Sequence, residues 1–318
     1  MITDRGNAIC LLEILKEFSD SEHILTMKEI QSKMSAVYGI RPDRRTVYSA
    51  VALLCDMGYD ISDYEDNGVG YYLRSRDFEQ PEVMLLTDAV HAFRFIPAKQ
   101  SEQLIEKLQK QLSVHQRKKY RHLTVARQEM KTDNRQVFLN LEILDEAITA
   151  KKQVSFTYLD YGIDKKLHPR REKAYIVNPY GLTYTNEHYY LICNYDGYDG
   201  TSFYRLDLIK DVKQLESDIS RKPENKNEVK DAVYAFSGKP EPVRMVCDKC
   251  ILKDVIDRFG TGIHVSEKDE NSFSVSFTAP PKGIRFWALQ YLPYAEVTEP
   301  KWLREEIIDS IKDNKYSV

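Results

Sequence analysis

Residues 175–212 read YIVNPYGLTYTNEHYYLICNYDGYDGTSFYRLDLIKDV, and this stretch decides the fold of the chain around it. Three short runs, at 174–177, 188–194 and 202–209, are rich in aromatic and β-branched residues. They are separated by the turn-forming residues Pro179, Gly181, Gly197 and Gly200. Short apolar runs divided by glycine and proline are typical of consecutive strands, so a β-meander is predicted here.

The last run places charged side chains among hydrophobic ones. Successive residues of a strand point to opposite faces, which predicts two sets: Tyr204, Leu206 and Leu208 on one face, and Phe203, Arg205 and Asp207 on the other. A lone buried charge is very costly. Arg205 and Asp207 therefore either pair with each other to stabilise the sheet or meet a ligand, and the alternation alone leaves both interpretations open.

Two segments, VNPYGLTYTNEHYYLI at 177–192 and FYRLDLI at 203–209, resemble the signature of the WYL-domain transcriptional regulators. In that family a PYAL-like turn precedes a Trp/Tyr-Tyr-Leu strand, and an R-x-D-R strand follows. The triplet is Tyr189, Tyr190 and Leu191 in this chain. Two residues depart from the pattern, because Tyr189 replaces Trp and Leu208 stands where a second basic residue is usual.

Length and composition indicate a soluble chain of several domains. With 318 residues, 42% of them hydrophobic, two or three cores are expected. No apolar run reaches membrane-spanning length and the N-terminus MITDRGNAIC lacks a signal-peptide pattern, so we expect a cytoplasmic protein without a membrane partner.

No motif indicates catalysis, a cofactor or a metal. Nucleophile elbows, zinc-protease motifs and phosphate-binding glycine loops are missing, and the seven histidines are dispersed. The five cysteines are expected to be reduced and structural, and the single pair Cys247 and Cys250 favours this over a metal or redox role. We therefore predict a protein that is not an enzyme.

Three helices are predicted in the first 60 residues. Ile9, Leu11, Leu12, Ile14 and Leu15 form an apolar stripe on a helix over 6–19. Thr26 with Glu29 makes a capping-box pattern for a second helix that ends near Ser35, and Asp43 is the expected cap of the third.

The third helix carries the predicted DNA contacts. Its apolar residues share one face, while the opposite face is small and basic, as close approach to a major groove requires. The candidate DNA-binding residues are Lys28, Arg41, Arg44, Arg45, Tyr48 and Ser49. A hairpin around Asn67-Gly68 then completes what resembles a winged helix-turn-helix. The alternative is a small helical domain for protein contacts, favoured by four acidic residues in the wing: Asp60, Asp63, Glu65 and Asp66.

Residues 81–135 are predicted to be helical, at 83–95, 101–112 and on to about 131. Only this segment is basic, with 11 basic against 6 acidic residues. Its densest run, Arg117-Lys118-Lys119-Tyr120-Arg121, is interpreted as a solvated face or as a contact to the DNA backbone.

A helix over 139–150 and about five strands are predicted next, with 167–173 joining the sheet. The family resemblance implies an Sm-like or SH3-like barrel here, and an aromatic and basic barrel face suits stacked bases and phosphate. The candidate ligand-binding residues are Tyr158, Arg170, Tyr180, Tyr190, Arg205 and Asp207.

After a polar linker, residues 240–318 are predicted in the order βαββαβ with a terminal helix, which resembles a ferredoxin-like fold. The stretch FWALQYLPYAEVTEPKWLREEI at 286–307 also resembles the C-terminal extension of WYL-domain regulators.

Together these features predict an α+β, multidomain chain: a winged helix-turn-helix at 1–80, a helical linker at 81–135, a WYL ligand-sensing domain at 136–222, a linker at 223–239 and a C-terminal WCX-type domain at 240–318. The predicted function is a homodimeric transcriptional regulator that binds a double-stranded DNA operator and senses a nucleotide or single-stranded nucleic acid. The alternative is a non-transcriptional nucleic-acid-binding accessory protein, for example of a defence system.

Overall fold

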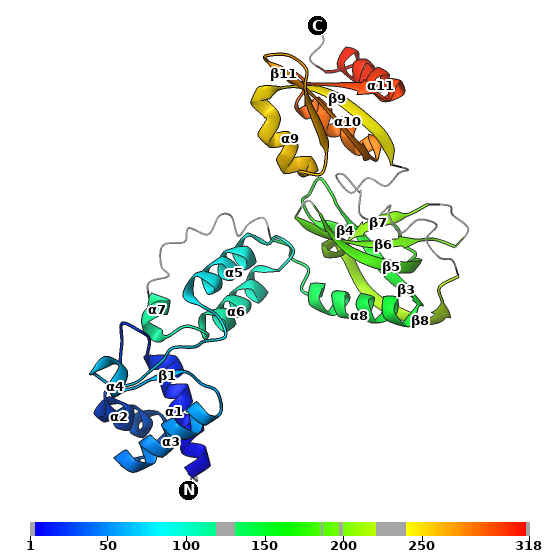
Figure 1. Ribbon diagram of the computed structural model, residues 1–318. Helices are drawn as coiled ribbons and strands as arrows, with labels where there is room; N and C mark the ends of the chain where they lie inside the picture. Colours follow the sequence, from blue (N-terminus) through cyan, green and yellow to red (C-terminus); the bar gives the residue numbers. More distant parts are fainter. Residues whose placement is uncertain (1–3, 119–130, 186, 197–199, 221–239, 316–318) are drawn as a thin grey trace. The chain divides into compact units, whose positions relative to one another are not determined.

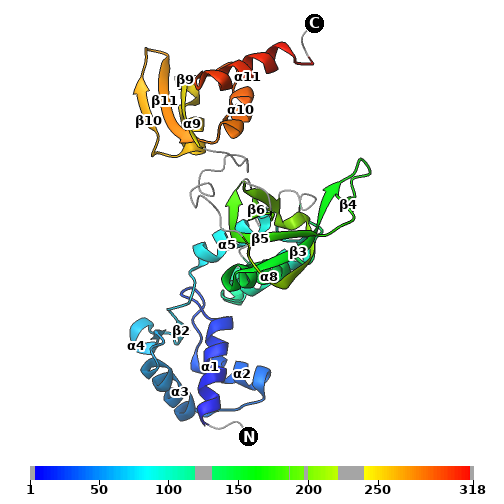
Figure 2. The ribbon, with the colours of Figure 1, turned by 90° about the vertical axis from the view of Figure 1, so that its right-hand side faces the viewer.

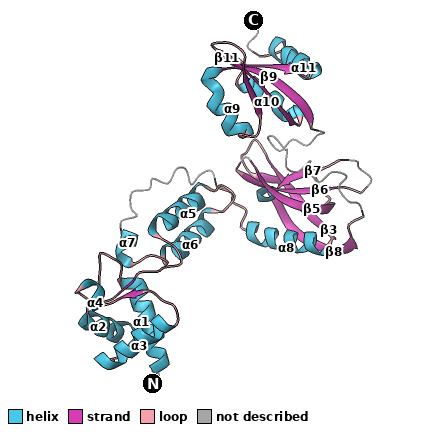
Figure 3. Ribbon diagram, viewed as in Figure 1, coloured by secondary structure: helices cyan, strands magenta, loops and turns pink. Residues whose placement is uncertain are grey.

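The computed structural model describes residues 4–118, 131–185, 187–196, 200–220 and 240–315 (Figure 1). The chain divides into two compact units, Met1–Asp133 and Asn134–Val318. The first is built mainly of helices, and the second contains two antiparallel sheets with helices packed on them (Figure 3). The predicted α+β, multidomain class is therefore confirmed.

The first unit opens with three helices and a small sheet. Its elements are α1 (Asp4–Phe18), α2 (Met27–Tyr38), α3 (Arg44–Asp56), β1 (Ile61–Ser62), α4 (Tyr64–Asn67) and β2 (Tyr72–Leu73). The two strands pair antiparallel.

Side-chain caps start two of these helices where the sequence predicts. The carboxylate of Glu29 accepts a hydrogen bond from the backbone N–H of Thr26 at 2.8 Å, and the Thr26 hydroxyl accepts one from the backbone N–H of Glu29. Asp43 accepts one from the backbone N–H of Thr46 at 2.8 Å. Such caps satisfy amide donors that have no partner inside the helix. Helix α2 ends later than expected, at Gly39 with φ of 69°, a left-handed conformation suited to glycine.

The core of this region lies between α1, α2 and α3. Leu11, Ile14, Leu15, Ile30 and Met34 are almost completely buried in it. The apolar stripe predicted for α1 is wrong at Ile9, whose side chain is 66% exposed. The buried face of α1 is instead continued by Ala8, a smaller side chain that allows close packing.

The predicted wing differs from a two-residue hairpin. Asp63 caps the one-turn helix α4 by accepting hydrogen bonds from the backbone N–H groups of Glu65 and Asp66. Gly68 ends this turn with φ of 70°. The prediction of a hairpin turn at Asn67-Gly68 is wrong because the aspartate cap makes residues 64–67 helical, and the strand pairing is limited to two residues on each side.

The described part of the first unit contains three further helices: α5 (Gln80–Ala92), α6 (Ala98–Gln109) and α7 (Val114–Lys118). The first two lie close to the predicted positions. The third predicted helix continues into residues 119–130, which lie outside the described part of the chain, as does most of the basic run 117–121.

The segment around α7 is fastened to the end of α1. The buried carboxylate of Asp20 accepts hydrogen bonds from the Ser113 hydroxyl and the backbone N–H of His23, and it lies 2.8 Å from the His23 ring nitrogen Nδ1. The rings of His23 and His115 stack with centroids 3.7 Å apart. Arg76 donates to the backbone carbonyls of Ser19 and Gln111. An ion pair between Arg117 and Glu17 adds a fourth contact. We call these four contacts the α1–α7 junction.

The second unit begins with α8 (Val137–Ala150) on a curled six-stranded antiparallel sheet. The strands are β3 (Lys152–Tyr161), β4 (Leu167–Pro169), β5 (Tyr175–Thr185), β6 (His188–Asn194), β7 (Ser202–Arg205) and β8 (Ile209–Asp218). Their order is β4-β3-β5-β6-β7, and β8 returns to pair with β3 (Figure 1). The sheet thus has one strand more than the five expected.

Two strand boundaries in this sheet differ from the prediction. Strand β5 continues through Pro179 and Gly181, which were expected to form a turn, because a bulge at Tyr180 absorbs the irregularity. Strand β7 ends at Arg205, and residues 206–208 form a 3-10 turn. The predicted alternation is therefore wrong beyond Arg205: Leu206, Asp207 and Leu208 are all buried.

Residues 167–173 were expected to enter the sheet, and only residues 167–169 do. Strand β4 pairs only with residues 159–161 of β3, and residues 170–173 form no strand. His168, Arg170 and Arg171 are exposed as a result.

The C-terminal elements follow the predicted order with ends shifted by a few residues at most. They are β9 (Glu241–Asp248), α9 (Leu252–Phe259), β10 (His264–Glu267), β11 (Ser272–Ala279), α10 (Pro281–Gln290), β12 (Ala295–Glu299) and α11 (Lys301–Lys312). The sheet order is β10-β11-β9-β12, all antiparallel. Val243, Met245, Val275, Ile284 and Trp287 form its core.

Candidate nucleic-acid interface and ligand site

The outer face of α3 presents the predicted DNA-contacting residues to solvent. Val47, Ala50 and Leu54 are buried on the inner face, and the helical repeat leaves the opposite side exposed. All six predicted DNA-contacting residues are exposed: Arg44, Arg45, Tyr48 and Ser49 on α3, Lys28 on α2, and Arg41 between the two helices. In the part of the chain that the structure describes, no carboxylate forms an ion pair with the four basic side chains among them. Their positive charge is therefore available to an anionic partner.

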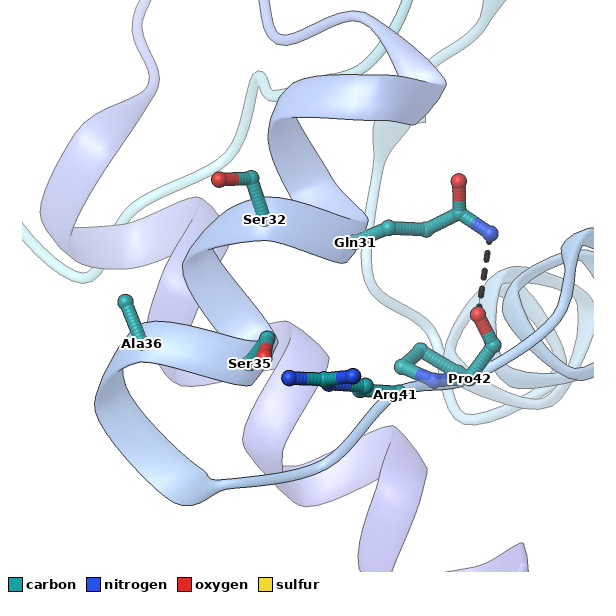
Figure 4. Close-up of a pocket in the computed structure, with 6 residues that line it drawn as sticks. All are labelled: Gln31, Ser32, Ser35, Ala36, Arg41 and Pro42. Atoms are coloured by element: carbon teal, nitrogen blue, oxygen red, sulfur yellow. Dashed lines mark hydrogen bonds between the residues drawn. The ribbon is translucent and has the colours of Figure 1, made fainter.

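A pocket of about 570 Å³ lies between α2 and the segment that leads into α3 (Figure 4). Its lining residues are Gln31, Ser32, Ser35, Ala36, Arg41 and Pro42. The Gln31 amide donates to the Pro42 carbonyl at 2.9 Å, which fixes the turn before α3. Two hydroxyls and one guanidinium on the wall of this pocket suit an anionic group such as a phosphate.

The acidic residues of the wing are partly neutralised. Arg74 pairs with Asp60 at 3.1 Å and also with Asp66. Hydrogen bonding from the backbone N–H of Asp63 and the nearby charge of Arg74 lower the pKa of Asp66, despite some opposing desolvation. Asp60 and Asp66 are paired with Arg74, and Asp63 caps α4. Of the four acidic residues, Glu65 alone has neither an ion pair nor a capping role among the described residues. The wing nevertheless stays negative, which weakens its approach to phosphates.

In the second unit, the 3-10 turn folds Asp207 back onto Arg205. Arg205 donates from Nε to Oδ1 at 3.1 Å and from Nη2 to Oδ2 at 2.6 Å. Asp207 is only 4% exposed, whereas the Arg205 side chain is 30% exposed. Burial opposes the charged form of Arg205, yet the bonds to Asp207 raise its pKa. The ion pair between Arg205 and Asp207, which the sequence left as one of two interpretations, is therefore present. Nη1 of Arg205 makes no hydrogen bond to the described residues.

Aromatic side chains surround this pair. Tyr190 lies opposite Arg205 in the β6–β7 register, and burial raises its pKa. The Tyr158 hydroxyl accepts a hydrogen bond from the backbone N–H of Arg205 at 3.4 Å. The Arg170 guanidinium lies 4.7 Å from the centre of the Tyr158 ring and pairs with Asp160. Five of the six predicted ligand-binding residues thus form one group, which we call the Arg205 group: Tyr158, Arg170, Tyr190, Arg205 and Asp207.

Tyr158 is the most buried aromatic of that group, at 6% exposed. Its ring packs edge-on against Tyr175 and Tyr204, so most of its surface is in the domain core. Burial accordingly raises the pKa of its hydroxyl. Tyr190 and Arg205, which are half-buried, offer more surface to a ligand.

Tyr180 belongs to a different polar cluster. Its hydroxyl donates to Asn194 at 2.7 Å, and the fully buried Asn178 donates to Asn194 at 2.9 Å and to Asp196 at 2.8 Å. Gln153 donates to Asn178 at 3.0 Å. The bulge at Tyr180 turns this side chain into the cluster rather than toward Arg205.

Sequence reasoning missed His188, whose Nδ1 lies 3.9 Å from Asp207 Oδ2. It precedes Tyr190 by two residues on β6, so the period of a strand puts both on one face. The alternation of side chains along this strand could have placed His188 beside Tyr190 from the sequence. His188 places a group that can carry a proton beside the buried carboxylate.

The five cysteines form no disulfide bond. All five are free thiols, with Cys55 and Cys250 exposed rather than in apolar surroundings. Burial raises the pKa of Cys247 to about 12, which keeps its thiol protonated. Among the described residues, no group of three or more His, Cys, Asp or Glu side chains is arranged to hold a metal ion. In the same part of the chain, no helix is both long and apolar enough to cross a membrane.

Comparison with known families identifies two domains. The WYL domain model matches residues 140–214, which contain the Arg205 group, and the WCX domain model matches residues 239–313. The chain is therefore a WYL-domain protein with a C-terminal WCX domain. The predicted resemblance to the WYL-domain regulators is confirmed.

Solved structures show only distant similarity. One is the proteasome accessory factor B/C (PafBC) of Arthrobacter aurescens, at 13% identity and a TM-score of 0.26, covering 98% of this chain and 48% of that one. This chain thus spans about half the length of PafBC. Another is a CRISPR Cas-related protein, at 12% identity and a TM-score of 0.38, covering 98% of this chain and 80% of that one. A search of curated proteins finds no match.

Proposed function

We propose that the chain is a transcriptional regulator that binds duplex DNA through α3. The observation that carries this proposal is the exposed face with Arg44, Arg45 and Ser49, which lacks ion pairs and lies opposite a buried apolar face. In this proposal residues 1–80 form a winged helix-turn-helix, and arginines on the helix contact guanine edges or phosphates. Lys28, Arg41 and Tyr48 position the helix on the DNA backbone.

The test replaces Arg44 and Arg45 with Ala and measures binding to a duplex selected from a random-sequence library. Each good bidentate base contact is worth about 1–3 kcal/mol, so affinity should fall tenfold or more. Lys99→Ala with Lys107→Ala on α6 is the control, because it removes the same charge from an exposed helix elsewhere in the unit. Unchanged affinity in the Arg44 and Arg45 variant would contradict the proposal.

The domain scheme is part of the same proposal. Residues 81–135 form a helical linker, 136–222 the WYL domain, 223–239 a second linker and 240–318 the WCX domain. The return of β8 to β3 supports an Sm-like or SH3-like barrel for the curled sheet. The order β10-β11-β9-β12 with crossing helices supports a ferredoxin-like fold for the C-terminal domain.

The WYL domain is the proposed sensor, and its ligand is a nucleotide or a short single-stranded nucleic acid. Arg205 Nη1 supplies a donor for phosphate, and the half-buried Tyr190 supplies a ring for a base. Tyr158, Arg170 and Asp207 hold these two in place, and Tyr180 takes part from its neighbouring cluster. Titration of the protein with nucleotides and with short oligonucleotides tests this directly, and Arg205→Ala should abolish binding.

Operator recognition requires two copies of α3, so we propose a cytoplasmic homodimer. Light scattering at micromolar concentration, with and without the selected duplex, should show the dimer. A monomer under both conditions would contradict it. Footprinting on the promoter of the protein's own gene then separates a transcriptional regulator from an accessory nucleic-acid-binding protein, since only the regulator protects a site there.

A further inference from the structure

The β3–β4 ribbon, residues 159–169, extends beyond the sheet of the WYL domain (Figure 2). Strand β3 pairs with β5 and β8 only up to Tyr158, and from Leu159 onward it pairs with β4 alone. The turn is closed by hydrogen bonds from the Gly162 N–H to the Lys166 carbonyl and from the Lys165 N–H to the Gly162 carbonyl, both 2.9 Å. The ribbon is therefore a two-stranded arm with both faces in solvent.

The tip of this arm is compact. His168 Nε2 lies 2.9 Å from the Asp164 carboxylate, and both side chains wrap around Gly162. A Cβ atom at Gly162 would lie 2.6 Å from the Asp164 carboxylate, so a larger residue there would displace that side chain. The turn thereby holds Ile163 in a defined position.

Apolar side chains occur where the arm is most exposed. Ile163 has a relative exposure of 106%, the highest of any large hydrophobic residue that the structure describes, and Tyr161 is 61% exposed. Neither contributes to a core. The Ile163 side chain, held at the end of a closed turn, is available to a partner. Without a partner, its apolar surface stays in contact with water.

The arm and the segment that follows it are together positively charged, although residues 159–169 alone carry two lysines and two aspartates. Residues 160–173 carry five basic and three acidic residues. Asp160 is neutralised by Arg170 at 2.7 Å, whereas Lys165, Lys166 and Lys173 form no ion pair within the described residues. The Arg171 guanidinium is fixed by the carbonyls of Lys173 and Ala174 and lies 3.6 Å from the centre of the Tyr175 ring, so its charge is not cancelled either.

We propose that the β3–β4 ribbon is a second DNA-contacting arm, which enters a groove of duplex DNA with Ile163 at its tip and Lys165 and Lys166 on the flanking phosphates. This inference rests on the proposed binding of duplex DNA by α3. The arm contacts the Arg205 group through the Arg170–Asp160 pair, and it does not require a ligand there.

Duplex DNA fits the arm better than another protein copy. A groove of B-DNA admits a two-stranded ribbon, and apolar tips are inserted between base steps by proteins that bend DNA. A second copy of this chain would bring its own Lys165 and Lys166, so these lysines would meet like charges if two arms paired side by side. Nucleic acid instead neutralises the lysines and covers the isoleucine.

The test separates charge from apolar contact. Lys165→Gln with Lys166→Gln should reduce the slope of log affinity against log salt by about 1.8, since each lost contact with a phosphate of B-DNA removes about 0.9. Ile163→Ser should weaken binding about tenfold and leave that slope unchanged, because it removes an apolar contact. The probe is the duplex selected for the wild-type protein, measured by fluorescence anisotropy.

Lys210→Gln with Lys213→Gln is the matched control, because both lysines are exposed on β8 of the same domain. The control should leave affinity and slope as in the wild type. An equal slope change in the control, or wild-type binding by both ribbon variants, overturns the inference. If binding were lost only in the Arg44 and Arg45 variant, the proposed binding of DNA by α3 would stand and the proposed role of the ribbon would be wrong. A larger effect of the ribbon variants on a single strand of the same length than on the duplex would also refute it.

Discussion

Arg205→Ala is expected to destabilise the second unit, by an amount set by the burial of Asp207. Removing one partner of a fully buried ion pair costs about 3–5 kcal/mol, because a charge is left without compensation. Here Asp207 is 4% exposed but Arg205 is 30% exposed in its side chain, so water screens part of the interaction. We therefore expect a loss of about 2–3 kcal/mol. For a unit of this size that corresponds to a decrease in Tm of about 4–12 °C.

A double variant and a matched control make the measurement specific. Arg205→Ala with Asp207→Asn should recover much of the loss, since an amide needs no counter-charge. Arg244→Ala removes an arginine from a pair with Glu299 in which both side chains are more than half exposed, and should cost less than about 1 kcal/mol. Thermal unfolding followed by circular dichroism and calorimetry supplies the values. An Arg205→Ala protein as stable as the wild type, or a double variant no better than the single one, would refute the reasoning.

Three further changes test other contacts. Thr26→Ala removes the capping box of α2 and should cost about 1 kcal/mol in denaturant unfolding, whereas Thr26→Ser should cost little. Asn178→Leu leaves the polar cluster around Asn194 without its central amide and should lower Tm by several degrees; an unchanged Tm would show that the cluster is dispensable. Burial lowers the pKa of His115, so the unfolded chain binds more protons below pH ~6.5 and stability of the first unit should fall as pH decreases through that value. His115→Asn should flatten this dependence between about pH 5 and 7, which unfolding midpoints across that range will check.

Local signals predicted much of the fold. The caps at Thr26 and Asp43 lie where they were expected because a capping residue acts on amides within three positions. The order of the C-terminal elements was predicted for the same reason. In each strand and helix there, the apolar residues repeat with the spacing of that element, and turn residues mark its ends. The WYL signature at Tyr189–Leu191 placed the central strand β6 correctly.

Positions set by contacts distant in sequence were not predictable. Pro179 and Gly181 indicate a turn locally, but pairing with β6 keeps the strand continuous through a bulge. The 3-10 turn at Leu206–Leu208 is held by Asn134, which donates to the carbonyls of Asp207 and Ile209 from more than 70 residues away in sequence. Tyr190 and Arg205 were predicted for one ligand-binding face and are neighbours in the β6–β7 register, whereas the placement of Tyr180 in another cluster was not predicted.

The α1–α7 junction determines where the N-terminal unit can be cut. A fragment ending at residue 80 would keep α3 but lose Ser113, Gln111 and Arg117, so Asp20, Arg76 and Glu17 would each lose one partner. A fragment ending at residue 118 keeps all four contacts. The shorter fragment should therefore be less stable even though α3 is intact, and the smallest fragment of the first unit that folds on its own should extend beyond β2 to include α7.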